Sequence, residues 1–350
     1  MQALSRGERL LLLGLAVLAV LAALTHYADV SKVLAFAVSG AALAGLAWTV
    51  SFATEQVGGR LGPAATGMLQ STLGNLPEFF VVLFALSKGE TVVAQTSLIG
   101  SILANALLVL GLVIVLGARR ERDGVMRFSP ALPRDTATLL LLASFIIVLL
   151  GLSLASGDKA SHHIDTISAV GAGCILAVYV AWAVPYIRSG GGDVSAEARV
   201  PVSVAATLLA VGGVGSAFVS EWFIDALDPA IHSLGISKAF AGLVIVAIAG
   251  NAVENATGLV LAHKGQADLA ISVVKNSVAQ VAAFLFPALV LVSLAFATHL
   301  TFSLAPVYIG AILLTAIVVA QVTSDGEATV FEGWALVAVY VMVAVLALYE

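Results

Sequence analysis

Two short motifs combine an amide and a carboxylate inside long apolar stretches of the sequence. Residues 74–78 read GNLPE and residues 250–254 read GNAVE. In each motif the Asn and the Glu stand three positions apart, so a helix would place both side chains on one face. Carboxylate and amide oxygens suit a hard cation such as Ca²⁺, whereas zinc or copper would call for His or Cys. The motifs therefore predict a cation site built from Glu78, Glu254, Asn75 and Asn251.

The composition decides which kind of protein carries these motifs. The chain has 350 residues, of which 60% are hydrophobic and only 11% are charged. Soluble domains keep about a quarter of their residues charged, so a soluble enzyme is excluded. The net charge of −5 excludes a nucleic-acid binder, which needs a basic surface. Because the apolar runs are too continuous for a β-barrel, the sequence predicts an all-α polytopic membrane protein in a lipid bilayer.

Charges, Gly and Pro clusters and polar turns divide the chain into about 11 predicted transmembrane helices. They cover residues 8–26, 31–51, 62–86, 91–117, 136–155, 164–187, 200–226, 239–262, 267–294, 304–322 and 331–349. With these spans, 11 of the 16 Lys and Arg residues fall on the side of the N-terminus and 4 on the opposite side. This excess predicts a cytoplasmic N-terminus and an outside C-terminus, in the plasma (inner) membrane.

The two motifs belong to an internal repeat with a constant offset of 176 positions. At the same offset the Lys-Gly pair at 88–89 matches the pair at 264–265, and Ser101 matches Ser277. The motifs fall in the third and eighth predicted helices, an odd number of spans apart, so the two copies enter the membrane from opposite sides. Inverted repeats of this kind place a transport site near the bilayer midplane, where the copies face each other.

Glu78 and Glu254 both lie deep in predicted helices, where an ionised carboxylate is costly and therefore a functional residue by default. Two facing carboxylates cannot both stay charged without a cation, so the site should take up protons when the cation leaves. This chemistry predicts exchange of a cation for protons at the same oxygens. Pro77 lacks a backbone N–H and interrupts its helix. Gly74, like its counterpart Gly250, lets another backbone approach closely.

The helix after each motif adds polar side chains at membrane depth, namely Ser101, Asn105, Ser277 and Gln280. Such groups also mediate ordinary helix packing, but their place directly after the motifs predicts a contribution to cation and proton binding. Two further carboxylates, Glu55 and Glu221, lie near the ends of the helices that precede the motifs. There they are either solvated or part of a pathway that recruits cations and relays protons.

At these residues the sequence resembles the Ca²⁺/H⁺ antiporter (CAX-type) family of the cation/Ca²⁺ exchanger superfamily. The likeness runs from Glu55 to about Gly111 and from Glu221 to about Pro287, and it includes both motifs. It implies one N-terminal helix followed by two inverted five-helix repeats. The corresponding segments are 1–28 for the N-terminal helix, 29–188 for the first sodium/calcium-exchanger-like repeat, 189–199 for a short cytoplasmic linker and 200–350 for the second repeat.

The resemblance implies a transporter that exchanges Ca²⁺ for H⁺ by alternating access, with Glu78 and Glu254 as the central ligands and with no resident cofactor. A monovalent Na⁺ or K⁺/H⁺ antiporter of the same fold is the alternative. A cation channel could use the same carboxylates as a selectivity ring, but one Glu in each inverted copy favours a single occluded site. An enzyme would need a nucleophile or a metal set that the spans lack. The oligomeric state is left open.

Several positions depart from the pattern of the family, and two of them bear on the ion and on proton coupling. Asn255 stands where the family often has His, so a proton-coupling imidazole is absent there. Lys275 falls inside the ninth predicted helix, where it either reaches up to the cytoplasmic surface or forms a salt bridge with Glu254 or Glu221. The salt bridge would reduce the negative charge of the site and favour a monovalent ion, which keeps the Na⁺/H⁺ alternative open.

Overall fold

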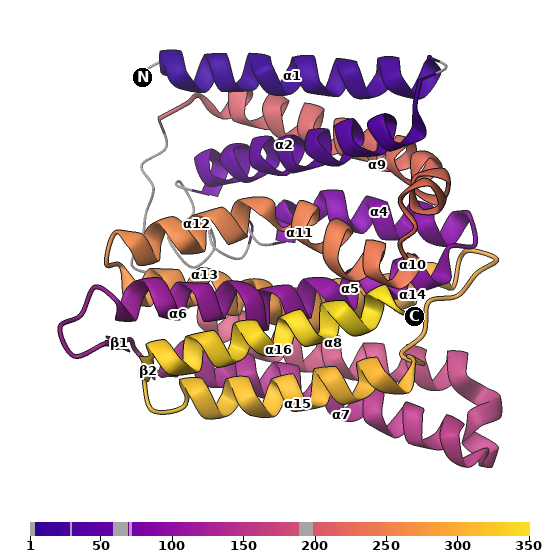
Figure 1. Cartoon of the computed structure of the whole chain (residues 1–350), viewed down its shortest axis with the longest axis vertical. Coiled ribbons are helices and arrows are strands. Elements are labelled where there is room, and N and C mark those ends of the chain that lie inside the picture. The colour runs from indigo at the N-terminus through magenta and orange to yellow at the C-terminus, as the bar shows by residue number, and fades with distance from the viewer. Residues whose placement is uncertain (1–3, 29, 59–68, 70–71, 189–198) are drawn as a thin grey trace.

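The computed structural model describes residues 4–28, 30–58, 69, 72–188 and 199–350, and it is a bundle of long helices with one very small sheet (Figure 1). The first half contains α1 (Arg6–Tyr27), α2 (Lys32–Gly58), α4 (Leu76–Ser87), α5 (Thr91–Leu103), η1 (Ala104–Val109), α6 (Leu110–Ala118), β1 (Val125–Arg127), α7 (Ala131–Ser156), η2 (Lys159–His163) and α8 (Ile164–Arg188). The second half contains α9 (Val202–Leu234), α10 (Lys238–Phe240), η3 (Ala241–Val246), α11 (Ala247–Gly250), α12 (Ala252–His263), α13 (Ala267–Gln280), η4 (Val281–Leu285), α14 (Phe286–Ser293), α15 (Pro306–Thr323), β2 (Glu327–Thr329) and α16 (Val330–Leu348).

Most of these helices can cross a membrane. Within the described residues, nine helices are long and apolar enough, and the bent pair Lys238–Gly250 and Ala252–His263 makes a tenth span. The polytopic helical fold is therefore confirmed. The predicted helix at 62–86 lies partly outside the described residues, and its described part, α4, has 12 residues. The total of eleven spans, and the division at residues 28, 188 and 199, stay predictions.

The chain also forms a two-stranded sheet that the sequence did not predict. β1 pairs antiparallel with β2, with Met126 opposite Ala328. The Arg127 guanidinium of β1 donates to Glu327 of β2 at 3.2 Å and to Asp123, in the loop before β1, at 2.8 Å. The hydrogen bond from Arg127 holds the pKa of the Asp123 carboxyl below its usual range. The sheet thus ties the loop after α6 to the loop before α16.

The helices form because the apolar runs are bounded by residues that satisfy free backbone groups. At the start of α1, Ser5 accepts from the Glu8 amide while the Glu8 carboxylate accepts from the Ser5 amide. Thr329 and Glu332 form the same reciprocal cap at the start of α16. Such a capping box satisfies two amides that the helix itself cannot reach. The starting points of α1 and α16 are therefore encoded locally.

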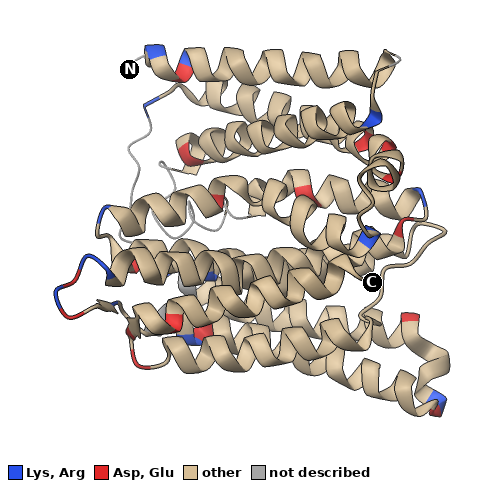
Figure 2. Cartoon of the chain, in the orientation of Figure 1, with Lys and Arg blue, Asp and Glu red and all other residues tan. Residues whose placement is uncertain are grey.

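The two copies of the repeat run in opposite directions. The turn after α4 lies at one end of the bundle. At this same end Ser237, at the start of α10, donates to the Ala347 carbonyl near the end of α16. The turn after α12 lies at the other end, where Arg120 donates to the His263 carbonyl beside the small sheet. The N- and C-termini also lie at opposite ends, and charged residues gather mostly at these two ends (Figure 2). Which end faces the cytoplasm stays a prediction.

The core lies around the two copies of the motif. α2 packs along α9, with α1 against both, and these three helices form one side of the bundle, while α7 and α15 lie on the opposite side (Figure 1). Between these layers α4, α5, α12 and α13 surround the motifs. Among the described residues three π-helical segments interrupt the central helices, and η1 and η4 lie at equivalent places in the repeat. Segments of this type are often found at functional sites.

Candidate functional site

Each copy of the motif breaks its helix at the Asn. In the second copy α11 ends at Gly250 and α12 begins at Ala252, and the two axes differ by 62°. Asn251 leaves the helical region, with φ −106° and ψ 18°. In the first copy Asn75, with φ −81° and ψ 6°, precedes α4. Pro77 lies in the first turn of α4, where its missing N–H is tolerated, yet the second break forms with Val253 in that place. Proline is therefore not required for the break.

Hydrogen bonds join the two copies through Ser101. Its hydroxyl donates to Glu78 Oε1 at 2.5 Å and accepts from Asn251 Nδ2 at 2.8 Å. Asn251 Oδ1 in turn accepts from the Ser277 hydroxyl at 3.4 Å. Glu78, Ser101 and Asn251 are at most 1% exposed. One buried network therefore links the first-copy carboxylate to the second-copy amide, as the repeat predicts for a site between the copies.

The glycines of the motifs place each glutamate side chain against the opposite helix break. A Cβ built on Gly74 would lie 2.8 Å from Glu254 Oε1. A Cβ built on Gly250 would lie 3.6 Å from Glu78 Cβ. Each glutamate therefore approaches the backbone of the other copy. This reciprocal arrangement brings both carboxylates to the junction of the two breaks.

The unpaired polar atoms at this junction are all oxygens. In the described part of the chain, one carboxylate oxygen of Glu78 and one of Glu254 are buried without a hydrogen-bond partner. The amide oxygens of Asn105 and Asn255 are in the same position, while Asn105 Nδ2 donates to the Ser101 carbonyl at 2.9 Å. Buried polar groups normally find partners. A set of acceptors without donors is what a hard cation or a proton would satisfy.

Some predicted site residues lie away from this junction. The Gln280 side chain hydrogen-bonds Tyr179 of α8, and no hydrogen bond joins it to Glu78 or Glu254 in the described chain. Glu55 is half-buried near the end of α2, where the neighbouring Gln56 accepts from the Arg199 amide at 2.9 Å. The role of Gln280 as a binding residue and of Glu55 as a pathway residue stays a prediction.

Glu221 is placed differently from the expectation. The helix predicted to end at residue 226 continues to Leu234, because Pro229 does not end it. Glu221 is therefore well inside α9 and half-buried. The prediction that Glu221 lies near the end of its span was wrong. Its position inside α9 argues against the alternative that it is only a solvated carboxylate at a helix end.

Lys275 fits neither of its two expected placements. Its side chain is 1% exposed, so it does not reach the surface. Among the described residues it forms no ion pair with Glu254, Glu221 or another carboxylate. Seven positions earlier on the same face of α13, Asp268 accepts from the Ser129 amide just before α7 at 2.6 Å. Lys275 therefore lies on the same side of α13 as Asp268, whereas Ser277 lies on the side toward Asn251.

Asn255 lies at the site but was not among the predicted site residues. Its buried, unpaired oxygen follows Glu254 directly, and the only sequence signal was its departure from the expected His. The described residues hold no group of three or more His, Cys, Asp or Glu that could bind a metal. Any cation here would thus depend on amide, hydroxyl and carbonyl oxygens in addition to the two glutamates.

Comparison with known proteins gives the family. A family model described as sodium/calcium exchanger protein matches residues 31–185 and 204–349. The chain belongs to this family. It is 30% identical to a Ca(2+)/H(+) antiporter of Synechocystis, across 91% of this chain and 92% of the relative. It is 31% identical to a vacuolar calcium ion transporter of Schizosaccharomyces pombe, across 87% and 76%.

Solved structures agree with this membership. The structure of native YfkE is 28% identical in sequence and superposes with a TM-score of 0.80. The match covers 97% of this chain and 99% of that chain. The predicted resemblance to the CAX-type family is therefore confirmed. Members of the exchanger family are membrane transporters, so the two helix breaks belong to a transport fold rather than to an enzyme.

Proposed function

We propose that this integral membrane protein exchanges Ca²⁺ for protons by alternating access at the junction of the two helix breaks. The observation that carries the proposal is the buried network Glu78–Ser101–Asn251, which joins the two inverted copies. The relatives named as Ca²⁺/H⁺ antiporters support the choice of ions. Half-helices that meet near mid-membrane are also the usual setting of transporter ion sites.

Glu78 and Glu254 are the proposed central ligands, since each has a buried oxygen without a donor. Asn75, Asn105, Asn251, Ser101, Ser277 and Gln280 are proposed to contribute further oxygens or to orient the glutamates. Ca²⁺ takes 6–8 oxygen ligands, so two carboxylates alone would leave it incompletely coordinated. Glu55 and Glu221 are proposed to line the approach to the site, and Lys275, Pro77, Gly74 and Gly250 to modulate it.

The exchange follows from the electrostatics of two close carboxylates. With Ca²⁺ present both can be ionised, because the cation balances their charge. When Ca²⁺ leaves, two adjacent negative charges at low dielectric are unfavourable, so protons bind at the same oxygens. Ca²⁺ and protons thereby compete, and neither can cross while the other occupies the site. A Na⁺ or K⁺/H⁺ exchanger of the same fold is the alternative.

The test is ion flux in proteoliposomes that carry a pH gradient, with Ca²⁺, Na⁺ and K⁺ compared. Wild-type protein should dissipate the gradient on addition of Ca²⁺, while Glu78→Gln and Glu254→Gln should reduce the rate at least about a hundredfold, since each removes one central charge. Glu121→Gln, at an exposed glutamate, is the matched control. Dissipation by Na⁺ but not Ca²⁺ would overturn the choice of ion, and full activity in both site variants would overturn the site.

We further propose that the N-terminus is cytoplasmic and the C-terminus outside, in the plasma membrane. The support is the excess of Lys and Arg on the side of the N-terminus and the placement of the termini at opposite ends of the bundle (Figure 1). Protease digestion of intact and inverted vesicles, with a tag at one terminus, tests this. Cleavage of an N-terminal tag from the outside of intact cells would contradict it.

A further inference from the structure

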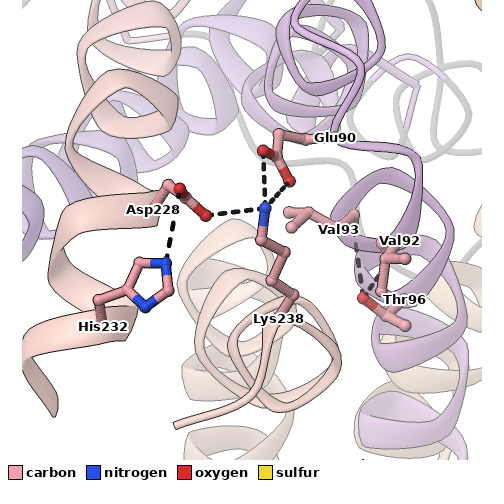
Figure 3. Close-up of polar contacts among 7 residues, drawn as sticks. All are labelled: Glu90, Val92, Val93, Thr96, Asp228, His232 and Lys238. Carbon is pink, nitrogen blue, oxygen red and sulfur yellow. Dashed lines mark hydrogen bonds and ion pairs between the residues drawn. The ribbon is translucent and has the colours of Figure 1, made fainter. Parts of the chain in front are cut away.

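A group of ion pairs lies at the end of the bundle that carries the C-terminus. Lys238 Nζ contacts both carboxylate oxygens of Glu90 at 2.8 Å and Asp228 Oδ1 at 2.7 Å (Figure 3). Lys88 forms a second ion pair with Asp225 nearby. We name this group of five residues the ionic latch. All five side chains are between 21% and 45% exposed, so the latch lies at the boundary with solvent.

The ionic latch connects the two copies of the repeat. Lys88 and Glu90 belong to the turn after α4, the half-helix that carries Glu78. Asp225 and Asp228 belong to α9, and Lys238 begins the span that leads to the second helix break. The end of α4 and the start of the second broken span, at α10, are therefore held together by the same group of ion pairs. A movement that separates α4 from α9 here must break the ion pairs.

Apolar side chains fill the space between the ionic latch and Glu78. A small cavity beside Glu78 is lined by Leu43, Val81, Phe223 and Val246, among others. Phe223 is fully buried and stacks on Phe36 with ring centroids 4.6 Å apart. Val81 lies one turn beyond Glu78 toward Lys88, and Phe223 lies two residues before Asp225. The route from the ionic latch to Glu78 is thus closed by apolar contact.

The opposite end is held differently, because Arg120 donates to the His263 carbonyl there and Asp268 accepts from the Ser129 amide. The turn after α12 repeats Lys88-Gly89-Glu90 as Lys264-Gly265-Gln266, with a neutral residue in place of Glu90. Within the described residues Lys264 forms no ion pair. α12 itself has only Gly258 and Ala262 buried, whereas six of the 12 residues of α4 are buried. Within the described residues the two ends therefore differ, since ion pairs hold the turn after α4, whereas hydrogen bonds hold the turn after α12 and the start of α13.

We propose that the ionic latch is the gate that closes the transport site toward the side of the C-terminus, and that its ion pairs break when the site opens to that side. This inference rests on the proposed function. Partly exposed ion pairs contribute little stability individually. A few of them can therefore hold one state of a two-state equilibrium and still release it in every transport cycle.

The test follows access to the cavity with a cysteine reporter. In a Cys174→Ser background, Val81→Cys places the only thiol beside Glu78, and a membrane-impermeant thiol reagent is added to each side of the vesicles separately. Lys88→Asp and Asp225→Lys each place like charges together and should raise the labelling rate from the latch side about three- to tenfold. The double swap restores an opposite pair and should return the rate to within about twofold of the parent.

Two controls separate the possible failures. Lys159→Asp changes a lysine in η2 that forms no ion pair in the described chain, and it should leave labelling unchanged. Ca²⁺-driven proton flux of the parent protein in the same vesicles tests the proposed function by itself, because labelling requires no transport. Unchanged labelling in both single variants would overturn the ionic latch. A rise that the double swap does not reverse would indicate damage to the fold and would overturn it as well.

Discussion

The backbone of Gly74 lies so close to the Glu254 carboxylate that a Cβ at this position would be 2.8 Å from Oε1. This contact crosses between the two copies of the repeat. Its counterpart is looser, since a Cβ on Gly250 would lie 3.6 Å from Glu78 Cβ, an ordinary van der Waals distance. The two helix breaks are therefore related by the repeat but are not equally tight, and the difference can be measured.

Gly74→Ala should impair exchange far more than Gly250→Ala. The methyl group at position 74 must displace the Glu254 carboxylate, and a displacement of about 1 Å at a reacting site can cost on the order of a hundredfold in rate. At position 250 the methyl group fits, so we expect less than about a threefold change, the matched control. Initial rates of Ca²⁺-driven proton flux measure both. Equal losses in the two variants would mean that the close contact does not position the carboxylate.

Ser101→Ala should weaken both the fold and Ca²⁺ binding. The substitution leaves Glu78 Oε1 without its donor and Asn251 Nδ2 without the hydroxyl acceptor, although the amide keeps its bond to the Ala247 carbonyl at 3.0 Å. Losing a buried partner costs about 1–3 kcal/mol. Thermal unfolding and the Ca²⁺ dependence of flux should therefore both shift.

Ser277→Ala is the matched control for Ser101. Its hydroxyl makes a longer bond of 3.4 Å to Asn251 and is not bonded to a carboxylate. We expect at most about 1 kcal/mol of destabilisation and a smaller change in apparent Ca²⁺ affinity. If the two serines behaved alike, the network through Ser101 would not be what joins the copies.

Lys275→Met should stabilise the protein. Burying a charged group without an ion-pair partner is unfavourable, so replacing Lys275 with an apolar side chain of similar length should raise the unfolding temperature. Because Lys275 lies on the same side of α13 as Asp268 and not on the side toward Asn251, the apparent Ca²⁺ affinity should change less than about twofold. A lower unfolding temperature with tighter Ca²⁺ binding would instead support the salt bridge to the site.

The sequence predicted the chemistry of the site better than its surroundings. Spacing and offset alone identified Glu78, Asn251 and Ser101, because polar residues are rare inside membrane spans and their repetition is informative. The link through the Ser101 hydroxyl, in contrast, depends on how three helices from two copies pack, which no periodicity encodes.

The wrong predictions also arise from tertiary packing that the sequence pattern does not encode. The seventh helix was predicted to end at residue 226, but it continues through Pro229 to Leu234, since a membrane helix can continue past proline when its neighbours satisfy the freed carbonyl. Lys275 was expected to reach solvent or a carboxylate, but its side chain is buried and forms no ion pair among the described residues. The strands at 125–127 and 327–329 are too short to show alternation, and they form only because two distant loops meet.

Ca²⁺ should stabilise the detergent-solubilised protein in a pH-dependent manner. A ligand that binds only the folded state adds about 2.7 kcal/mol at a hundred times its dissociation constant. Protons compete for Glu78 and Glu254, so the stabilisation at a fixed Ca²⁺ concentration should fall as the pH is lowered and rise as it is increased. Thermal unfolding at several pH values, with and without Ca²⁺, measures this without any need for transport.

The same titration in Glu78→Gln and Glu254→Gln assigns the effect to the site. Each variant should lose most of the Ca²⁺-dependent shift, while Glu121→Gln, with its exposed carboxylate, should keep it. Replacing Ca²⁺ with Na⁺ at equal ionic strength distinguishes the two candidate ions, since screening alone would act on all variants equally. A Ca²⁺ shift that survives in both site variants would place the bound ion elsewhere and remove the physical basis for competition with protons at these oxygens.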